Sequence, residues 1–85
     1  MSPKPRRIGG LDVNRVSDGY VIYRHASEVV HYLNLTGAFI FELCDGKTPV
    51  EWMPDLVREA FELAEPPEDE VSSCLSELYR ASLIE

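Results

Sequence analysis

Few side chains in this sequence have the type and spacing that chemistry requires. Cys44 and Cys74 lie far apart, neither belongs to a C-x-x-C pair, and no histidine stands at metal-ligand spacing from them. The serines between residues 72 and 76 have no base beside them, and there is no glycine-rich phosphate loop. The sequence therefore predicts no catalytic residue, no metal and no cofactor. Both cysteines fall in apolar helical patterns and are interpreted as reduced core thiols, with a disulfide left open.

Length and composition predict one globular domain. The chain has 85 residues, 45% of them apolar, and no apolar run approaches the roughly 20 residues that cross a bilayer. No apolar stretch follows the basic start MSPKPRR, so we expect no secretory signal and a cytoplasmic location. All 15 acidic residues lie from Asp12 onward, so the body is more acidic than the net charge of −7 indicates. Such a body repels nucleic acid and suits a partner that carries positive charge.

The first half of the chain predicts a tail and a small sheet. Residues 1–8 contain two prolines and three cations without periodicity, which predicts a flexible tail before a domain at 9–85. Three short runs, Leu11–Val16, Tyr20–Arg24 and Val29–Leu33, predict strands. The first two are joined by Ser17-Asp18-Gly19, which is typical of a tight hairpin. Strands this close in sequence predict an antiparallel meander.

The predicted first helix begins at Asn34 or Thr36, both of which are good caps, and ends near Cys44 before Asp45-Gly46. Phe41 lies off the main apolar stripe, so we expect this helix to be covered on more than one side. The stripe itself comprises Leu35, Ala38, Phe39, Leu43 and Cys44, with Ile40 at its edge.

Two more helices follow. A capping box at Thr48 to Glu51 predicts the start of the second, and Pro54 then either kinks this helix or opens it after a separate turn; the kink is favoured. Its stripe comprises Met53, Leu56, Val57, Ala60, Phe61 and Ala64. Pro67 and the acidic residues 68–70 predict the start of the third helix. Its apolar face comprises Val71, Cys74, Leu75 and Leu78, extended by Tyr79. The predicted order is βββααα, an α+β fold.

Two motifs carry a resemblance to a known family. They are His31-x-Leu33-Asn34-x-Thr36-Gly37-Ala38 and Leu43-Cys44-Asp45-Gly46-Lys47-Thr48, followed by an ending at Leu78 to Ile84. Together, over about Leu11 to Glu85, the chain resembles the PqqD-like family of RiPP recognition elements. Ser82 stands where many members have glycine, and few members carry a proline such as Pro54.

This resemblance implies a winged-helix-like fold and a non-catalytic adaptor. In such an adaptor the leader of a ribosomally made precursor peptide adds as a strand beside the third strand and presses on the third helix. The implied partner is a modifying enzyme such as a radical SAM maturase, a cyclodehydratase or a leader peptidase.

The candidate peptide-binding residues lie on two elements. The third strand offers an edge, with Val29, His31 and Leu33 on one face and Val30 and Tyr32 on the other. His31 either contacts the peptide or is simply exposed, Leu33 is expected in the core, and Tyr32 is a groove residue or a surface aromatic. The third helix contributes Val71, Leu75, Leu78 and Tyr79, of which Leu75 and Leu78 also suit the core.

Two other classes of function remain as alternatives. Winged-helix domains often bind DNA, but the third helix offers Arg80 against Glu68, Asp69, Glu70 and Glu77, which argues against that class. A dimerisation or scaffold domain stays open, because an exposed edge strand can pair with a second copy.

Overall fold

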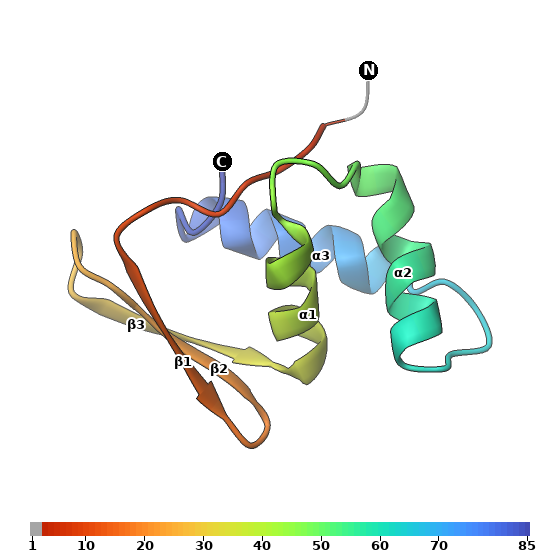
Figure 1. Ribbon diagram of the computed structural model, residues 1–85, viewed down its shortest axis with the longest axis horizontal. Helices are drawn as coiled ribbons and strands as arrows, with labels where there is room; N and C mark the ends of the chain where they lie inside the picture. Colours follow the sequence, from red (N-terminus) through yellow and green to blue (C-terminus); the bar gives the residue numbers. More distant parts are fainter. Residues whose placement is uncertain (1–2) are drawn as a thin grey trace.

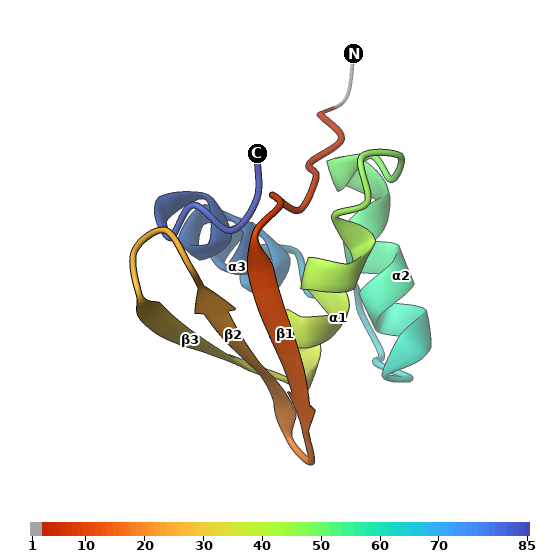
Figure 2. The same ribbon diagram turned by 60° about the vertical axis from the view of Figure 1, so that its left-hand side comes forward.

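The computed structural model describes residues 3–85 and has the predicted α+β architecture, a three-stranded antiparallel sheet followed by three helices in a winged-helix-like arrangement (Figure 1). The elements are β1 (Leu11–Val16), β2 (Gly19–Arg24), β3 (Val29–Asn34), α1 (Leu35–Leu43), a 3₁₀ turn η1 (Val50–Trp52), α2 (Met53–Ala60) and α3 (Glu68–Arg80). Turning the molecule shows the sheet on one side of α1 and α2 on the other (Figure 2).

The sheet has the order β1-β2-β3, and Gly19 closes its first hairpin. Gly19 has a φ of 151°, and a Cβ there would lie 1.8 Å from the carbonyl oxygen of Leu33 on β3. Any side chain would therefore push β2 and β3 apart, so the Asp18-Gly19 signal reflects a close approach between strands as well as a turn.

Helix α1 is the centre of the core. The Asn34 side chain accepts a hydrogen bond from the Gly37 N–H at 2.8 Å, so Asn34 is the cap and Thr36 is not. The helix contacts β2, β3, α2 and α3, which confirms that it is covered on more than one side. Ile40 and Phe41 are fully buried as a result, whereas Leu35, expected in the stripe, is 55% exposed.

Pro54 opens α2 rather than kinking a longer helix. The chain makes the separate turn η1 first, and Pro54 then occupies the first turn of α2, where its missing N–H costs nothing. The favoured kink is therefore wrong, and the separate-turn alternative is confirmed. The capping box is also wrong, because the Thr48 hydroxyl donates to the Asp45 carboxylate instead. The same carboxylate accepts from the N–H groups of Lys47 and Thr48, which holds the pKa of Asp45 below its usual value.

Helices α2 and α3 end in the same way, with a non-glycine residue in the left-handed region. Ser82 has a φ of 58°, and the N–H groups of Ser82 and Leu83 bond back to the carbonyls of Tyr79 and Leu78. This is the Schellman ending that glycine favours, so Ser82 carries a modest strain that glycine would avoid. The ending of α3 buries Leu83, and the chain then buries Ile84.

The tail was predicted over residues 1–8, of which residues 1–2 lie outside the part of the chain that the structure describes. Residues 3–8 lie along the domain beside the C-terminal segment (Figure 1). Arg6 and Glu85 exchange two main-chain hydrogen bonds and pair through their side chains, and Pro5 is buried. The Arg7 guanidinium donates to the carbonyls of Phe41 and Glu42 in the last turn of α1, and the Phe41 carbonyl also accepts from the Cys44 N–H. Main-chain pairing of this kind leaves no periodicity in the sequence, so composition alone indicated a tail.

Candidate functional site

The hydrogen-bonding pattern of β2 fixes which groups on β3 are free. The His25 N–H bonds to the Gly10 carbonyl at 3.5 Å, next to the β1–β2 ladder. Hydrogen-bonded pairs alternate along an antiparallel ladder, so Arg24 and Ile22 direct their main-chain groups to the other neighbour, β3.

On β3, the partners of Arg24 and Ile22 are Val29 and His31. The intervening residues Val30 and Tyr32 therefore direct their N–H and C=O groups away from the sheet. β3 is the last strand of the sheet, and no other strand among residues 3–85 pairs with it there. The outer side of β3 is consequently an open edge that another backbone can join.

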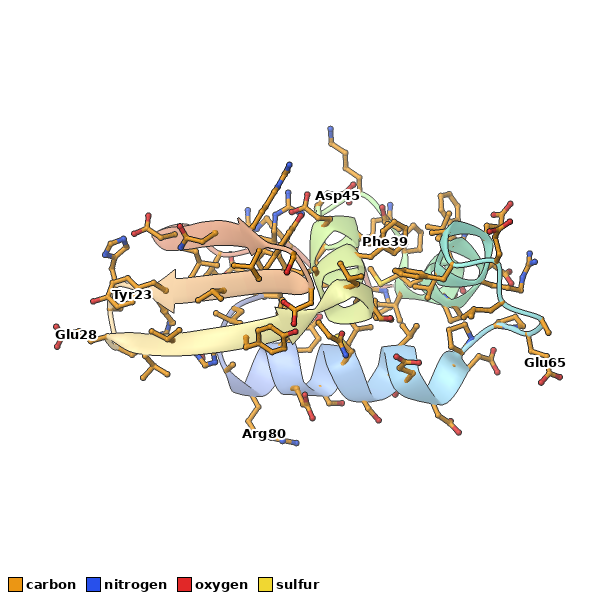
Figure 3. All side chains as sticks on the ribbon, turned by 90° about the horizontal axis from the view of Figure 1, so that it is seen from below. Tyr23, Glu28, Phe39, Asp45, Glu65 and Arg80 are labelled. Atoms are coloured by element: carbon orange, nitrogen blue, oxygen red, sulfur yellow. The ribbon has the colours of Figure 1, made fainter. Side chains whose placement is uncertain are left out.

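A groove separates this open edge from α3, which runs beside β3 (Figure 3). No Cα atom of β3 lies within 8 Å of a Cα atom of α3. Two cavities of about 290 and 250 Å³ lie between β3 and α3. Both are lined by Tyr32, Leu33, Cys74 and Glu77, so they adjoin, and together they are called the groove. The remaining lining residues are Asn34, Thr36, Gly37, Ile40, Glu70 and Ser73 in the larger cavity and Val30, His31, Leu78, Ala81 and Leu83 in the smaller.

The groove combines buried apolar residues with an acidic rim. Ile40, Leu78 and Leu83, all buried, are among its lining residues. Glu70 and Glu77 on α3 are exposed and line it as well. Such a groove can take a backbone on its β3 side and apolar side chains between β3 and α3.

Cys74 lies in the groove with its thiol protonated. Burial, first of all, and then the carboxylates of Glu77 and Glu70 together raise its pKa to about 11. At neutral pH the group is therefore a small apolar surface and a poor nucleophile. Cys44 differs, because it is fully buried, donates to the Ile40 carbonyl at 3.3 Å and has a pKa raised to about 12, first of all by burial. Both cysteines are free thiols in the structure.

The candidate residues on β3 lie mostly along the groove. Val30, His31, Tyr32 and Leu33 line the groove, and His31 is half-buried rather than simply exposed. Tyr32 is 55% exposed, and its hydroxyl donates to the Asp18 carbonyl at 3.1 Å across the hairpin. Val29 lies at the end of the strand, is exposed and lines neither cavity.

The candidate residues on α3 are not brought together. Leu78 lines the groove, but Val71, Leu75 and Tyr79 line a separate cavity of about 410 Å³ beside Pro3, Val50 and Pro54. They therefore do not line the groove beside β3. They repeat at every fourth residue along α3 and face η1, α2 and the N-terminal segment, as buried apolar stripes usually do.

The groove side of α3 is the stripe that sequence reasoning passed over. It comprises Glu70, Ser73, Cys74, Glu77 and Ala81, which recur at helical spacing beside the apolar stripe. The largest apolar side chains of α3 belong to the core, so they do not mark the side that lines the groove. The sequence signal that could have indicated this side was the position of Cys74. Cys74 and Ala81 are the two apolar members of this otherwise polar stripe.

An open sheet edge facing a C-terminal helix across a groove defines the class of small, winged-helix-like domains suited to strand addition. The sequence model of the family described as Coenzyme PQQ synthesis protein D (PqqD) matches residues 19–84, from β2 to the end of the C-terminal segment, and the chain belongs to this family. No curated protein and no solved structure matches the chain at a significant level.

Family membership supports a role in peptide recognition within the modification of ribosomally made peptides, as a non-catalytic element that works with modifying enzymes. Across residues 3–85, no cluster of histidine, cysteine and acidic side chains is placed to hold a metal ion. In the same part of the chain, no helix combines the length and apolar character needed to span a membrane.

Proposed function

We propose that this chain binds the leader of a ribosomally made precursor peptide as an extra strand along β3 and presents it to a separate modifying enzyme. The open edge at Val30 and Tyr32, facing α3 across the groove, is the observation that carries this proposal. The family match supports the same role from an independent direction.

The groove runs along the free edge of a single strand. A guest strand would lie about 4.8 Å from β3, on the side that faces α3. The guest would bond through its main chain to Val30 and Tyr32, and every second side chain would enter the apolar space near Leu33 and Leu78. Main-chain bonds then supply affinity, and the apolar space supplies selection between leaders.

The enzyme that receives the leader belongs to the same proposal. A radical SAM maturase, a cyclodehydratase or a leader peptidase would act on a core peptide that extends beyond the bound leader. The adaptor contributes local concentration and orientation, because binding turns the encounter of enzyme and substrate into an intramolecular step. A cytoplasmic location remains an expectation.

A titration of the labelled chain with the leader of a precursor encoded beside its gene tests the proposal. We expect binding at micromolar concentrations or tighter, as small strand-addition interfaces allow. Backbone amide shifts should cluster at residues 30–33 and on the side of α3 that carries Cys74 and Glu77. Shifts clustered around Tyr79, or concentration-dependent pairing of β3 with a second copy in place of leader binding, would contradict the proposal.

A further inference from the structure

The α3 wall of the groove carries two carboxylates that point to the chemistry of its occupant. Glu70, Cys74 and Glu77 lie on one face of α3, because residues four and seven apart share a face of a helix. Both glutamates line the larger groove cavity, and both raise the pKa of the Cys74 thiol between them. The negative charge of the two glutamates therefore acts on groups inside the groove as well as on the solvent.

The described part of the chain does not neutralise these carboxylates. The ion pairs among residues 3–85 join Arg6 to Glu85, His25 to Asp12 and Arg58 to Asp55, and none includes Glu70 or Glu77. No lysine or arginine lines either groove cavity, and His31 is the one basic side chain there. An acidic guest would meet repulsion on this wall, and a basic guest would supply the missing counter-charge.

We infer that the groove selects a leader segment with two basic residues, lysine or arginine, on either side of an apolar residue that faces Cys74. This inference rests on the proposed strand addition at β3 and adds the class of sequence that binds there. Glu70 and Glu77 are about 10 Å apart along the helix axis at 1.5 Å per residue. Side chains on one side of an extended strand recur at every second residue, so the two basic residues are four positions apart with the apolar residue midway between them. Their Cα atoms are then about 13 Å apart, and their long side chains cover the difference from the carboxylate spacing.

The probe is a display library of random short peptides, panned on the full chain. Counter-selection on the Tyr32→Pro variant, which lacks one outward N–H on β3, retains only peptides that use the open edge. We expect the retained pool to be enriched in paired lysine or arginine around an apolar residue. Panning on the chain with Glu70→Lys and Glu77→Lys should replace the basic pair by aspartate or glutamate.

A quantitative step follows with one selected peptide and its lysine-to-glutamine version. Glu70→Gln combined with Glu77→Gln should weaken the basic peptide roughly tenfold and leave the glutamine version unchanged. The weakening should shrink as salt rises from about 0.1 to 1 M, because exposed charge pairs are screened. Glu68→Gln is the matched control, since Glu68 lies on α3 but lines the opposite cavity, and it should change neither affinity.

The outcomes separate this inference from the proposed function. Edge-dependent binders without basic enrichment, or equal affinities for both peptides in all variants, would overturn the charge selection and leave strand addition intact. A pool that disappears on counter-selection would mean that no peptide uses the β3 edge, and both proposals would fail together.

Discussion

The two sides of α3 show how one helix holds a domain together and also borders a site. One side carries Val71, Leu75 and Tyr79 and packs towards α2, η1 and the N-terminal segment. The other side carries Cys74 and Glu77 and faces β3 across a gap. The apolar side packs against the chain's own elements and keeps a cavity beside Tyr79, whereas the polar side lies beside an unpaired strand.

This difference follows from the free energy to which each side contributes, that of folding or that of binding. Val71 and Leu75 are 1% and 5% exposed, so the apolar side contributes burial to the stability of the domain. The groove side buries little until a guest arrives, and its contribution is to binding. Mutations on the two sides should therefore separate loss of folding from loss of recognition.

The largest expected effect is a loss of stability from a mutation on the apolar side of α3. Leu75→Ala removes a buried side chain from the core and should lower the free energy of unfolding by about 2–4 kcal/mol, measured by urea denaturation. Glu77→Ala on the groove side should change it by less than about 0.5 kcal/mol. Equal losses for both variants would show that the groove side also supports the fold.

The next largest effect is expected from a substitution that removes a free N–H group from the open edge of β3. Tyr32→Pro removes an outward N–H without removing a bond of the β2–β3 ladder, so leader affinity should fall by about tenfold or more while the protein stays folded. Val13→Pro is the matched control, because Val13 lies on β1 at the opposite edge of the same sheet. Calorimetry with the leader measures both, and a Tyr32→Pro variant that binds normally would contradict strand addition at β3.

The alkylation rate of the Cys74 thiol reports whether a leader occupies the groove. With its pKa raised to about 11, Cys74 is almost fully protonated at pH 8, and its alkylation by iodoacetamide should be at least about tenfold slower than that of an exposed cysteine. The rate should rise as pH increases towards 11, because the thiolate is the reactive form. A saturating concentration of leader should lower the alkylation rate of Cys74 further, which mass spectrometry can follow. Cys44 should stay unreactive with and without the leader.

The smallest expected effect tests the corrected placement of Tyr79. Tyr79→Glu adds a charge at a position that is 45% exposed and lines the cavity opposite the groove, so leader affinity should stay within about twofold. Fluorescence titration of the folded variant with the leader measures this. A large loss of affinity would show that Tyr79 contributes to leader binding, and that the two sides of α3 do not have separate roles.

Local signals predicted those features that depend on a few neighbouring residues. The three strands, the Asp18-Gly19 hairpin and the alternation along β3 were correct because turn chemistry and strand periodicity act over short distances. Pro54 was misjudged, because whether a proline opens a helix or kinks it depends on how the preceding turn packs. The contacts of residues 3–8 could not be predicted, because their partners, Glu85 and the end of α1, lie far along the chain.

The sequence by itself determined the order of the elements, the acidic character of the body and the strand that forms an edge. Only the tertiary structure decided which side of α3 meets that edge, because helical spacing defines the stripes of a helix but not its rotation about its own axis. That rotation is set by burial of Val71, Leu75 and Leu78 against the rest of the core, and it leaves Glu70, Cys74 and Glu77 along the groove.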